Sequence, residues 1–306
     1  MTAKLRERRA CSARTTPWRA PLPGRRPLQL ADLAVDVLIA EAMLTPKPAL
    51  VDRRGSGAHR DLDLMRLVRS ARSLHGSFLQ MATAAEGREP DQALRERLAL
   101  IGRAAERDML AATGGSNAHR GAIWVIGLLV AARAMCGADA SPREIAAQAG
   151  RIAAVPDRYA PPQDSHGAHA CRRYGVRGAR GEACAGFPHV VDIGLPAMWA
   201  ARANRADETC ARLDALMAIM ASLDDTCLLH RGGLPALAAA QSGARAVLAA
   251  GGSSTAAGWC ALLRLDADLV KRYASPGGCA DLLAACLFLD CIQPYRSARN
   301  FRAVTW

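Results

Sequence analysis

The sequence predicts an all-α protein made of a single multi-helix domain. Half of the 306 residues are hydrophobic, led by Ala and Leu, whereas Phe and Tyr number only four each. Ala and Leu are strong helix formers, and the residue types that favour strands are thinly represented. Apolar residues recur at helical spacing along most of the chain, with no strand pattern and no repeat of fixed period.

The first half of the chain holds five predicted helices. Residues 28–43, about 61–83 and about 91–112 show amphipathic periodicity. Residues 121–135 are apolar on nearly every face, which predicts a buried central helix. The fifth helix begins at Ser141-Pro142-Arg143-Glu144, because Ser and Glu at this spacing form a capping box and Pro suits the first helical position.

The second half opens with the least regular stretch, residues 156–186, which is rich in Pro, Gly and His. Helices are predicted to resume near residues 190–203, 207–223, 234–250, 255–273 and 276–290. Polar residues gather between these apolar segments. We therefore expect the polar chemistry to lie in loops at helix junctions.

The basic character of the chain is concentrated at its N-terminus. The formal net charge is +12, and residues 1–27 contain eight basic residues and one acid. This Pro- and Arg-rich segment predicts a disordered basic tail, followed by an all-helical catalytic domain over residues 28–306. The tail could bind an acidic partner such as nucleic acid. The remaining residues show no helix-turn-helix or basic-aromatic stripe, so we expect no nucleic-acid partner.

Ten cysteines are present without any C-x-x-C pair, and most lie in apolar helical stretches. Reduced, buried thiols of this kind are typical of cytoplasmic proteins. The longest apolar run, residues 121–132, is too short to cross a bilayer. No apolar signal segment follows the basic start. We expect a cytoplasmic protein without a membrane partner.

Two polar segments lie in the first half. Residues 45–63 bring Lys47, Asp52, Arg53, His59 and Asp61 into one Gly-containing loop, although the acids could simply start a helix. Residues 114–121 place Gly114, Gly115, Asn117, His119 and Arg120 just before the buried helix. Glycines and polar groups at a helix N-terminus can cradle phosphate, and the alternative is an ordinary Gly-ended helix.

Two further polar segments lie in the second half. Residues 174–188 carry Arg177, Arg180 and Glu182 among glycines, a pattern that suits polyphosphate or a solvated turn. Residues 224–233 carry Asp224, Asp225, His230 and Arg231. Paired carboxylates beside Thr can hold Mg²⁺, or can remain uncommitted at a helix terminus. Together the four segments predict a helical enzyme that handles a phosphorylated, Mg²⁺-bound substrate.

The same segments resemble the motifs of the triphosphoribosyl-dephospho-coenzyme A synthase family. Residues 44–54 (L-T-P-K-P-A-L-V-D-R-R) and 57–63 (G-A-H-R-D-L-D) resemble the opening motif. Later motifs follow in order at residues 114–122, 177–188, 224–233 and 275–283. The similarity covers roughly residues 30–290. The D-R-R…G-A-H-R-D and D-D-T…H-R-G-G forms are most similar to the malonate decarboxylase branch, with the citrate lyase branch as the alternative.

The resemblance implies a specific reaction. The ribose 2′-hydroxyl of 3′-dephospho-coenzyme A attacks C1′ of ATP, adenine leaves, and the triphosphate stays attached. A separate transferase then passes the product to an acyl carrier protein. This chemistry needs Mg²⁺ and cations for the triphosphate, carboxylates for an oxocarbenium-like state, and groups that move protons.

Each polar residue receives an expected role on this basis. The substrate- and phosphate-binding set is Lys47, Arg53, Gly114, Gly115, Asn117, Arg120, Arg177, Arg180, His230 and Arg231. The Mg²⁺ or oxocarbenium carboxylates are Asp52, Asp61, Asp224 and Asp225, and the catalytic set is His59, His119, Glu182 and Asp225. His75 and His189 are interpreted as structural. Alanine at Asp225 or Glu182 is expected to abolish adenine release and leave the fold intact.

Two other functions fit parts of the pattern. An ADP-ribosyl hydrolase-like enzyme also needs acids around Mg²⁺, and it would release no adenine from ATP. A nucleic-acid-binding protein would depend on the basic tail.

Overall fold

The computed structural model describes residues 26–161 and 165–292, so predictions about residues 1–25 and 293–306 concern residues outside the described ones. The described residues form helices and no strand, with one isolated bridge between Asp52 and Gly55. This confirms the all-α class. The first seven helices are α1 (Arg26–Met43), α2 (Leu64–Ser73), α3 (His75–Ala85), α4 (Gln92–Thr113), α5 (Arg120–Met135), α6 (Pro142–Ala154) and α7 (His166–Tyr174). The others are α8 (Gly178–Cys184), the π-helix η1 (His189–Gly194), α9 (Leu195–Ala203), α10 (Glu208–Met220), α11 (Thr226–Ala249), α12 (Ala256–Lys271) and α13 (Gly277–Cys291).

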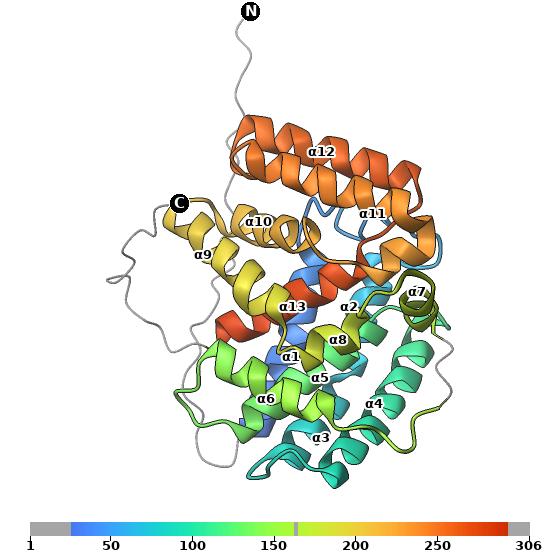
Figure 1. Cartoon of the computed structure of the whole chain (residues 1–306), viewed down its shortest axis with the longest axis vertical. Coiled ribbons are helices and arrows are strands. Elements are labelled where there is room, and N and C mark those ends of the chain that lie inside the picture. Colours follow the sequence, from blue (N-terminus) through green and yellow to red (C-terminus); the bar gives the residue numbers. More distant parts are fainter. Residues whose placement is uncertain (1–25, 162–164, 293–306) are drawn as a thin grey trace, which may run out of the picture.

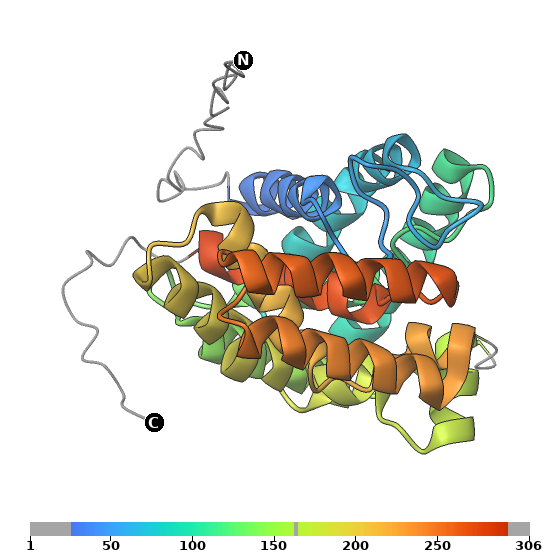
Figure 2. The ribbon, with the colours of Figure 1, turned by 90° about the horizontal axis from the view of Figure 1, so that it is seen from above.

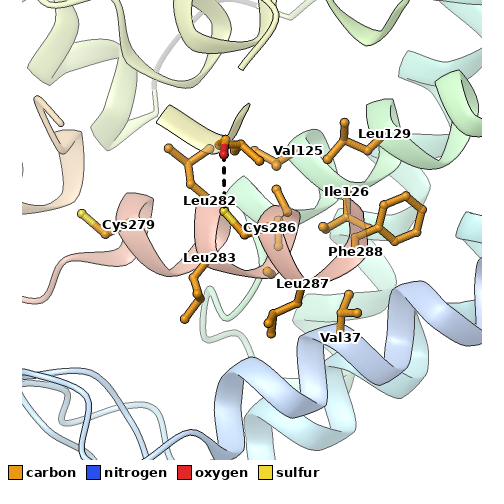
Figure 3. Close-up of a cluster of buried hydrophobic side chains, with 14 of the residues drawn as sticks. Val37, Val125, Ile126, Leu129, Cys279, Leu282, Leu283, Cys286, Leu287 and Phe288 are labelled. Carbon is orange, nitrogen blue, oxygen red and sulfur yellow. Dashed lines mark hydrogen bonds between the residues drawn. The ribbon is translucent and has the colours of Figure 1, made fainter. Parts of the chain in front are cut away.

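Two helices form the centre of the core. In α5 every residue from Ala122 to Ala134 is buried except Trp124, which confirms the predicted central helix. The C-terminal helix α13 is equally apolar, and Figure 3 shows its side chains against Val125, Ile126 and Leu129 of α5. Cys286 of α13 also points its thiol at the carbonyl oxygen of Val190, 3.9 Å away. Each large apolar side chain buried here contributes about 1.5–3 kcal/mol.

The other helices pack around this central pair in two layers. Helices α1 and α3 contact it from one side, and α6, α8 and η1 contact it from the other. Figure 1 shows α9 and α8 in front of α13, with α1 behind it, and Figure 2 shows the same two layers from above. The pair α11 and α12 lies side by side across one end of the molecule (Figure 1).

Side-chain caps set most helix starts. Ser141 and Glu144 form the predicted capping box, with Pro142 in the first turn. Asp63 caps α2 by accepting from the Arg66 amide, so the helix starts at Leu64 and not near Asp61 as predicted. The predicted single helix over about 61–83 was wrong, because the chain turns at fully buried Leu74 and continues as α3.

The stretch over residues 156–186 is more helical than predicted. It contains α7, which begins after the side-chain cap Ser165 and ends at Gly175 in the left-handed conformation (φ 69°). It also contains α8, only seven residues long. Such short helices show little periodicity in sequence, because helices of nine residues or fewer bury only one or two side chains here. The prediction that Arg180 and Glu182 lie in a loop was therefore wrong.

The helix α11 is kinked near its start. Gly233 has φ 64° and ψ −162°, and Pro235 follows it. A side chain at residue 233 would be strained there, and its Cβ would lie 3.2 Å from the Tyr174 hydroxyl. The predicted helix from residue 234 is thus the second part of α11. His230 and Arg231 lie in the helical turns before the kink, and not in a loop as predicted.

Helix α1 includes Arg26 and Pro27, whereas the first helix was predicted from residue 28. Arg26 already belongs to α1, and its guanidinium donates to the carbonyl oxygens of Arg133 and Cys136. These bonds tie the start of α1 to the end of α5. Across the described residues, none of the helices combines the length and apolarity needed to cross a membrane.

Candidate active site

One large cleft, of about 1310 Å³, brings the predicted motifs together. Its walls come from the loop after α1, the N-terminal ends of α5, α11 and α13, and helices α7 and α8. Five segments that are far apart in sequence therefore share one site. The sequence-predicted residues that line it are Lys47, His59, Asn117, His119, Arg120, Arg177, Arg180, Glu182, Asp224, Asp225, His230 and Arg231.

Five predicted residues lie outside the cleft lining: Asp52, Arg53, Asp61, Gly114 and Gly115. Asp52 is buried and accepts from the Lys47 amide at 2.9 Å and from the Arg54 guanidinium at 2.7 Å, so it shapes the loop. Gly114 ends α4 in the left-handed conformation. We assign these two residues a structural role, because their polar groups and backbone angles serve the chain itself.

The part of the cleft lined by the buried residues Glu41, Lys47 and His119 and by half-buried Asp281 is here called the deep end. Lys47 is 1% exposed and Glu41 is 6% exposed, and their Nζ and Oε1 atoms lie 2.5 Å apart. Removing two charges from water is costly, and only close pairing offsets that cost. Lys47 is therefore committed to Glu41, and it does not extend into open solvent as a flexible phosphate ligand would.

His119 is the residue just before α5. Its Nδ1 lies 2.7 Å from the Ser70 hydroxyl, and its buried Nε2 has no hydrogen-bond partner among the described residues. Burial, aided by the charge of Lys47, lowers the pKa of His119 to about 4. The ring is consequently neutral near pH 7 and has one unsatisfied nitrogen.

The carboxyl groups of Asp225 and Asp281 differ in their hydrogen bonds. Asp225 caps α11 by accepting from the Cys227 amide at 2.7 Å, and it also accepts from the Cys279 amide of α13 at 2.8 Å. Burial raises the pKa of Asp225 and these amides oppose the rise. Asp281 shows no such hydrogen bonds within the described residues. Burial, with Glu41 and Asp225 nearby, holds the pKa of Asp281 well above its usual range.

Glu182 and His189 form a carboxylate–histidine pair on the cleft wall. The Oε1 of Glu182 accepts from the His189 backbone amide and its Oε2 from the His189 Nδ1, both at 2.8 Å. The hydrogen bond to Glu182 is the main cause that raises the pKa of His189. The interpretation of His189 as merely structural was incomplete, since the ring lines the cleft in a fixed orientation.

His59 joins three segments of the chain. Arg231 lies 3.2 Å from its Nδ1, and the Ser275 hydroxyl lies 2.8 Å from its Nε2. Burial is the main cause that lowers the pKa of His59 to about 4, followed by the charge of Arg231. Because Arg231 can only donate, His59 is neutral and donates from Nε2 to Ser275. Its bonds hold the loop after α1 against α11 and the start of α13.

The exposed part of the cleft, here called the mouth, carries Arg177, Arg180, Asp224, His230 and Arg231. Arginines therefore outnumber acids there. His230 also stacks on His166, with ring centroids 3.8 Å apart. Arg120 is less available, because it is ion-paired with Glu106 at 3.0 Å.

The sequence reasoning missed several charged or polar residues of the cleft, among them Glu41, Arg95, His166 and Asp281, and it interpreted His189 as structural. Glu41 and Asp281 gave no distinct signal, because each shares its helix with other acids, Asp32 and Asp36 in α1 and Asp290 in α13. Arg95 lies on the face of an amphipathic helix and gave no signal. Its guanidinium lies 5.2 Å from the Trp124 ring centroid, a cation–π contact that only the fold creates.

The described part of the chain does not form a metal site made only of protein ligands. The described residues contain no group of three or more His, Cys, Asp or Glu that could hold a metal ion. Of the four predicted metal carboxylates, only Asp224 is exposed in the cleft. Mg²⁺ commonly uses one or two carboxylates together with substrate phosphates and water. The site therefore fits Mg²⁺ that arrives with a polyphosphate.

Comparison with protein families accounts for the motifs that meet in this cleft. Residues 27–300 match the model of the CitG family, described as ATP:dephospho-CoA triphosphoribosyl transferase. The chain belongs to this family. It is therefore a transferase, and the resemblance of its motifs to this family is confirmed.

Curated relatives agree with the family model. Proteins from Azotobacter vinelandii and Pseudomonas aeruginosa (strain UCBPP-PA14) are 55% and 59% identical to the chain. The alignments cover 88% and 85% of this chain and 93% and 89% of the relatives. Both are named probable 2-(5''-triphosphoribosyl)-3'-dephosphocoenzyme-A synthase. No solved structure matches the chain.

Proposed function

We propose that the chain transfers the triphosphoribosyl group of ATP to the ribose 2′-hydroxyl of 3′-dephospho-coenzyme A and releases adenine. The observation that carries this proposal is the polarity of the cleft. Arg177, Arg180 and Arg231 gather at the exposed mouth, whereas the deep end is buried and its charges are paired. A nucleotide has a matching arrangement, because its triphosphate is charged and its base is uncharged. The names of the relatives support the substrates.

The mouth is the proposed triphosphate site. Guanidinium groups bind phosphate oxygens in a bidentate manner, so Arg177 and Arg180 suit the role that the sequence assigned to them. Asp224 would hold Mg²⁺ together with those oxygens. When bound, the ion supplies positive charge that the triphosphate would otherwise lack. Binding the triphosphate without attacking it leaves C1′ of the ribose as the reacting centre.

The pair of Glu182 and His189 is the proposed acceptor of the hydroxyl proton. Glu182 fixes the ring through Nδ1 and raises the pKa of His189, which makes the ring a stronger proton acceptor. The proton leaves the 2′-hydroxyl as the bond from its oxygen to C1′ forms. Glu182 thus acts through His189, and its role in proton transfer is to orient that ring.

The product is proposed to serve an acyl carrier protein, to which a separate transferase attaches it. The D-R-R…G-A-H-R-D and D-D-T…H-R-G-G forms favour the carrier of malonate decarboxylase over that of citrate lyase. Supplying the purified product and the separate transferase to each carrier, and comparing the labelled fractions, tests this preference. Equal or greater labelling of the citrate lyase carrier would contradict it.

The central experiment is incubation of the purified protein with ATP, Mg²⁺ and 3′-dephospho-coenzyme A, followed by chromatography. We expect adenine in equal amount to a product whose mass is that of both substrates minus adenine. Hydrolysis of an ADP-ribosyl substrate without adenine release from ATP would favour the hydrolase alternative. Removing residues 1–25 should leave the reaction unchanged, whereas a nucleic-acid-binding function would require them.

A further inference from the structure

The deep end of the cleft has features that the proposed triphosphate site does not explain. Glu41, Lys47 and His119 are each no more than 6% exposed. Leu50, Val51, Leu62, Leu67 and Ala118 also line the cleft, and the last four of them belong to one small apolar cluster. An apolar lining with a few polar groups, here called the slot, is typical of small-molecule sites.

The charges of the deep end do not suit phosphate. Lys47 is the cation there, and Glu41 already neutralises it at 2.5 Å. The remaining carboxyl, Asp281, lies close enough to Glu41 and Asp225 that both disfavour its ionised form. A polyphosphate placed here would meet two acids and no available cation. Its oxygens are better satisfied by the arginines of the mouth.

His119 supplies an unsatisfied polar atom at the deep end. Its Nε2 is buried without a partner among the described residues, while Nδ1 is engaged by the Ser70 hydroxyl. A buried polar atom without a hydrogen bond is unfavourable, and a ligand that supplies the missing partner removes this penalty. The neutral ring can donate to, or accept from, the edge of a heterocyclic base.

Asp281 is held against the backbone at the start of α5. A Cβ on Gly121 would lie 1.9 Å from the Asp281 Oδ2, so only glycine at residue 121 admits this carboxyl. Both residues line the cleft beside His119. The carboxyl thus reaches the slot from α13 at a fixed position. Its surroundings favour the protonated form, which can donate a proton or a hydrogen bond.

Resting on the proposed function, we propose that the deep end is the subsite for the adenine of ATP, with Asp281 as the acid that protonates the departing base and His119 as its hydrogen-bond partner. The bond from C1′ to N9 breaks, and its electron pair goes to the purine. The Asp281 proton moves to a ring nitrogen of that purine. The bond from C1′ to the acceptor oxygen forms, and the hydroxyl proton goes to His189. Exchange with solvent restores both groups.

The acid role is tested by Asp281→Asn, with Asp290→Asn on the same helix as the matched control. Asp290 pairs with Arg202 away from the cleft. We expect Asp281→Asn to lower kcat with ATP by about 10²–10⁴-fold, the usual range for general acid catalysis, with a small change in KM. Turnover of nicotinamide riboside triphosphate should be unaffected by Asp281→Asn, because nicotinamide leaves as a neutral molecule and needs no proton. An equal loss with both substrates would overturn the acid role.

Base binding is tested separately, without turnover, by calorimetry with adenine and with inorganic triphosphate. His119→Phe should weaken adenine binding at least tenfold and leave triphosphate binding unchanged, while Arg177→Ala should do the reverse. Circular dichroism would verify that each variant is folded. Failure of the wild-type protein to release adenine from ATP would contradict the proposed function but not the adenine subsite. Failure of His119→Phe to weaken adenine binding would overturn the subsite even if the enzyme is active.

Discussion

The deep end and the mouth of the cleft differ in how their charges are satisfied. At the deep end Lys47 is paired with Glu41, and both side chains are almost fully buried. At the mouth Arg177 and Arg180 are exposed to solvent. Buried charges require a partner within the protein, whereas exposed charges remain available to a ligand. A charged residue in the cleft can thus serve the fold or the substrate, depending on its burial.

The largest expected effect on activity is at the pair of Glu182 and His189 on the cleft wall. Glu182→Gln should lower kcat for adenine release by about 10²–10⁴-fold, because it removes the negative charge that orients His189. The variant should also move the ascending limb of the pH–rate profile to lower pH. The hydrogen bond to Glu182 raises the pKa of His189, so its loss lowers that pKa. An unchanged limb would argue against His189 as the base.

The largest expected effect on stability is at the deep end. Lys47→Met should lower the free energy of unfolding by about 3–5 kcal/mol, because it leaves Glu41 buried and unpaired. Arg177→Met at the mouth should change it by no more than about 0.5 kcal/mol. Denaturant unfolding of both variants measures the contrast. A Lys47→Met, Glu41→Leu double variant should regain most of the loss, and equal destabilisation by the two single variants would contradict this difference.

The neighbouring residues Asp225 and Asp224 give a matched comparison one residue apart. Asp225→Ala should lower the free energy of unfolding by about 2 kcal/mol, since it removes the α11 cap and the bond to the Cys279 amide. The expectation from sequence was that alanine there leaves the fold intact, whereas these two hydrogen bonds predict a measurable loss of stability. Asp224→Ala should keep stability within about 0.5 kcal/mol and raise the Mg²⁺ concentration needed for activity. Equal thermal stability of both variants would contradict the assignment.

At the mouth, Arg177→Ala and Arg180→Ala should each raise KM for ATP by about tenfold, and lysine at either position should recover only part of the loss. The wild-type KM should rise with salt, because exposed charges are screened. The Asp290→Asn control should keep the wild-type KM and its salt dependence. A KM that is insensitive to salt and to these arginines would place the triphosphate elsewhere.

A further expected effect is a pH dependence of stability. Burial lowers the pKa values of His59 and His119 to about 4, so the unfolded chain binds more protons than the folded one below about pH 6.5. Stability from these two residues is therefore present above pH 6.5 and is lost as pH falls toward 4. In the His119→Gln variant, the free energy of unfolding should fall less between pH 6.5 and pH 4 than in the wild-type protein. The pKa of His189 is raised, so its contribution instead declines as pH rises past its folded value.

Local sequence rules predicted the regular helices well. The capping box at Ser141 and the apolar pattern of residues 121–135 each depend on neighbours within a few residues, and both were confirmed. The break at Leu74 and the short helices α7 and α8 were not predicted. Leu74, whose side chain is fully buried, separates α2 from α3. That burial depends on helices distant in sequence, which no local pattern records.

The motifs predicted which residues line the cleft better than they predicted the role of each residue. Twelve of the predicted residues line it, because polar segments in an apolar chain tend to converge where water is admitted. Residue roles depend on partners that the sequence does not reveal. Asp225 holds two helices together, and His59 bonds to Ser275, 216 residues away. Both had been predicted to act directly on the substrate.

By itself, the sequence determined the all-helical class, the central helix α5 and the family of the chain. Those features arise from helix propensity, periodicity and short motifs, which are local properties. Only the tertiary structure decided that Glu41 neutralises Lys47, that Asp281 reaches the cleft beside Gly121, and that Glu182 acts through His189. Burial and pairing set the charge that each of these groups presents, and both arise only when distant segments pack together.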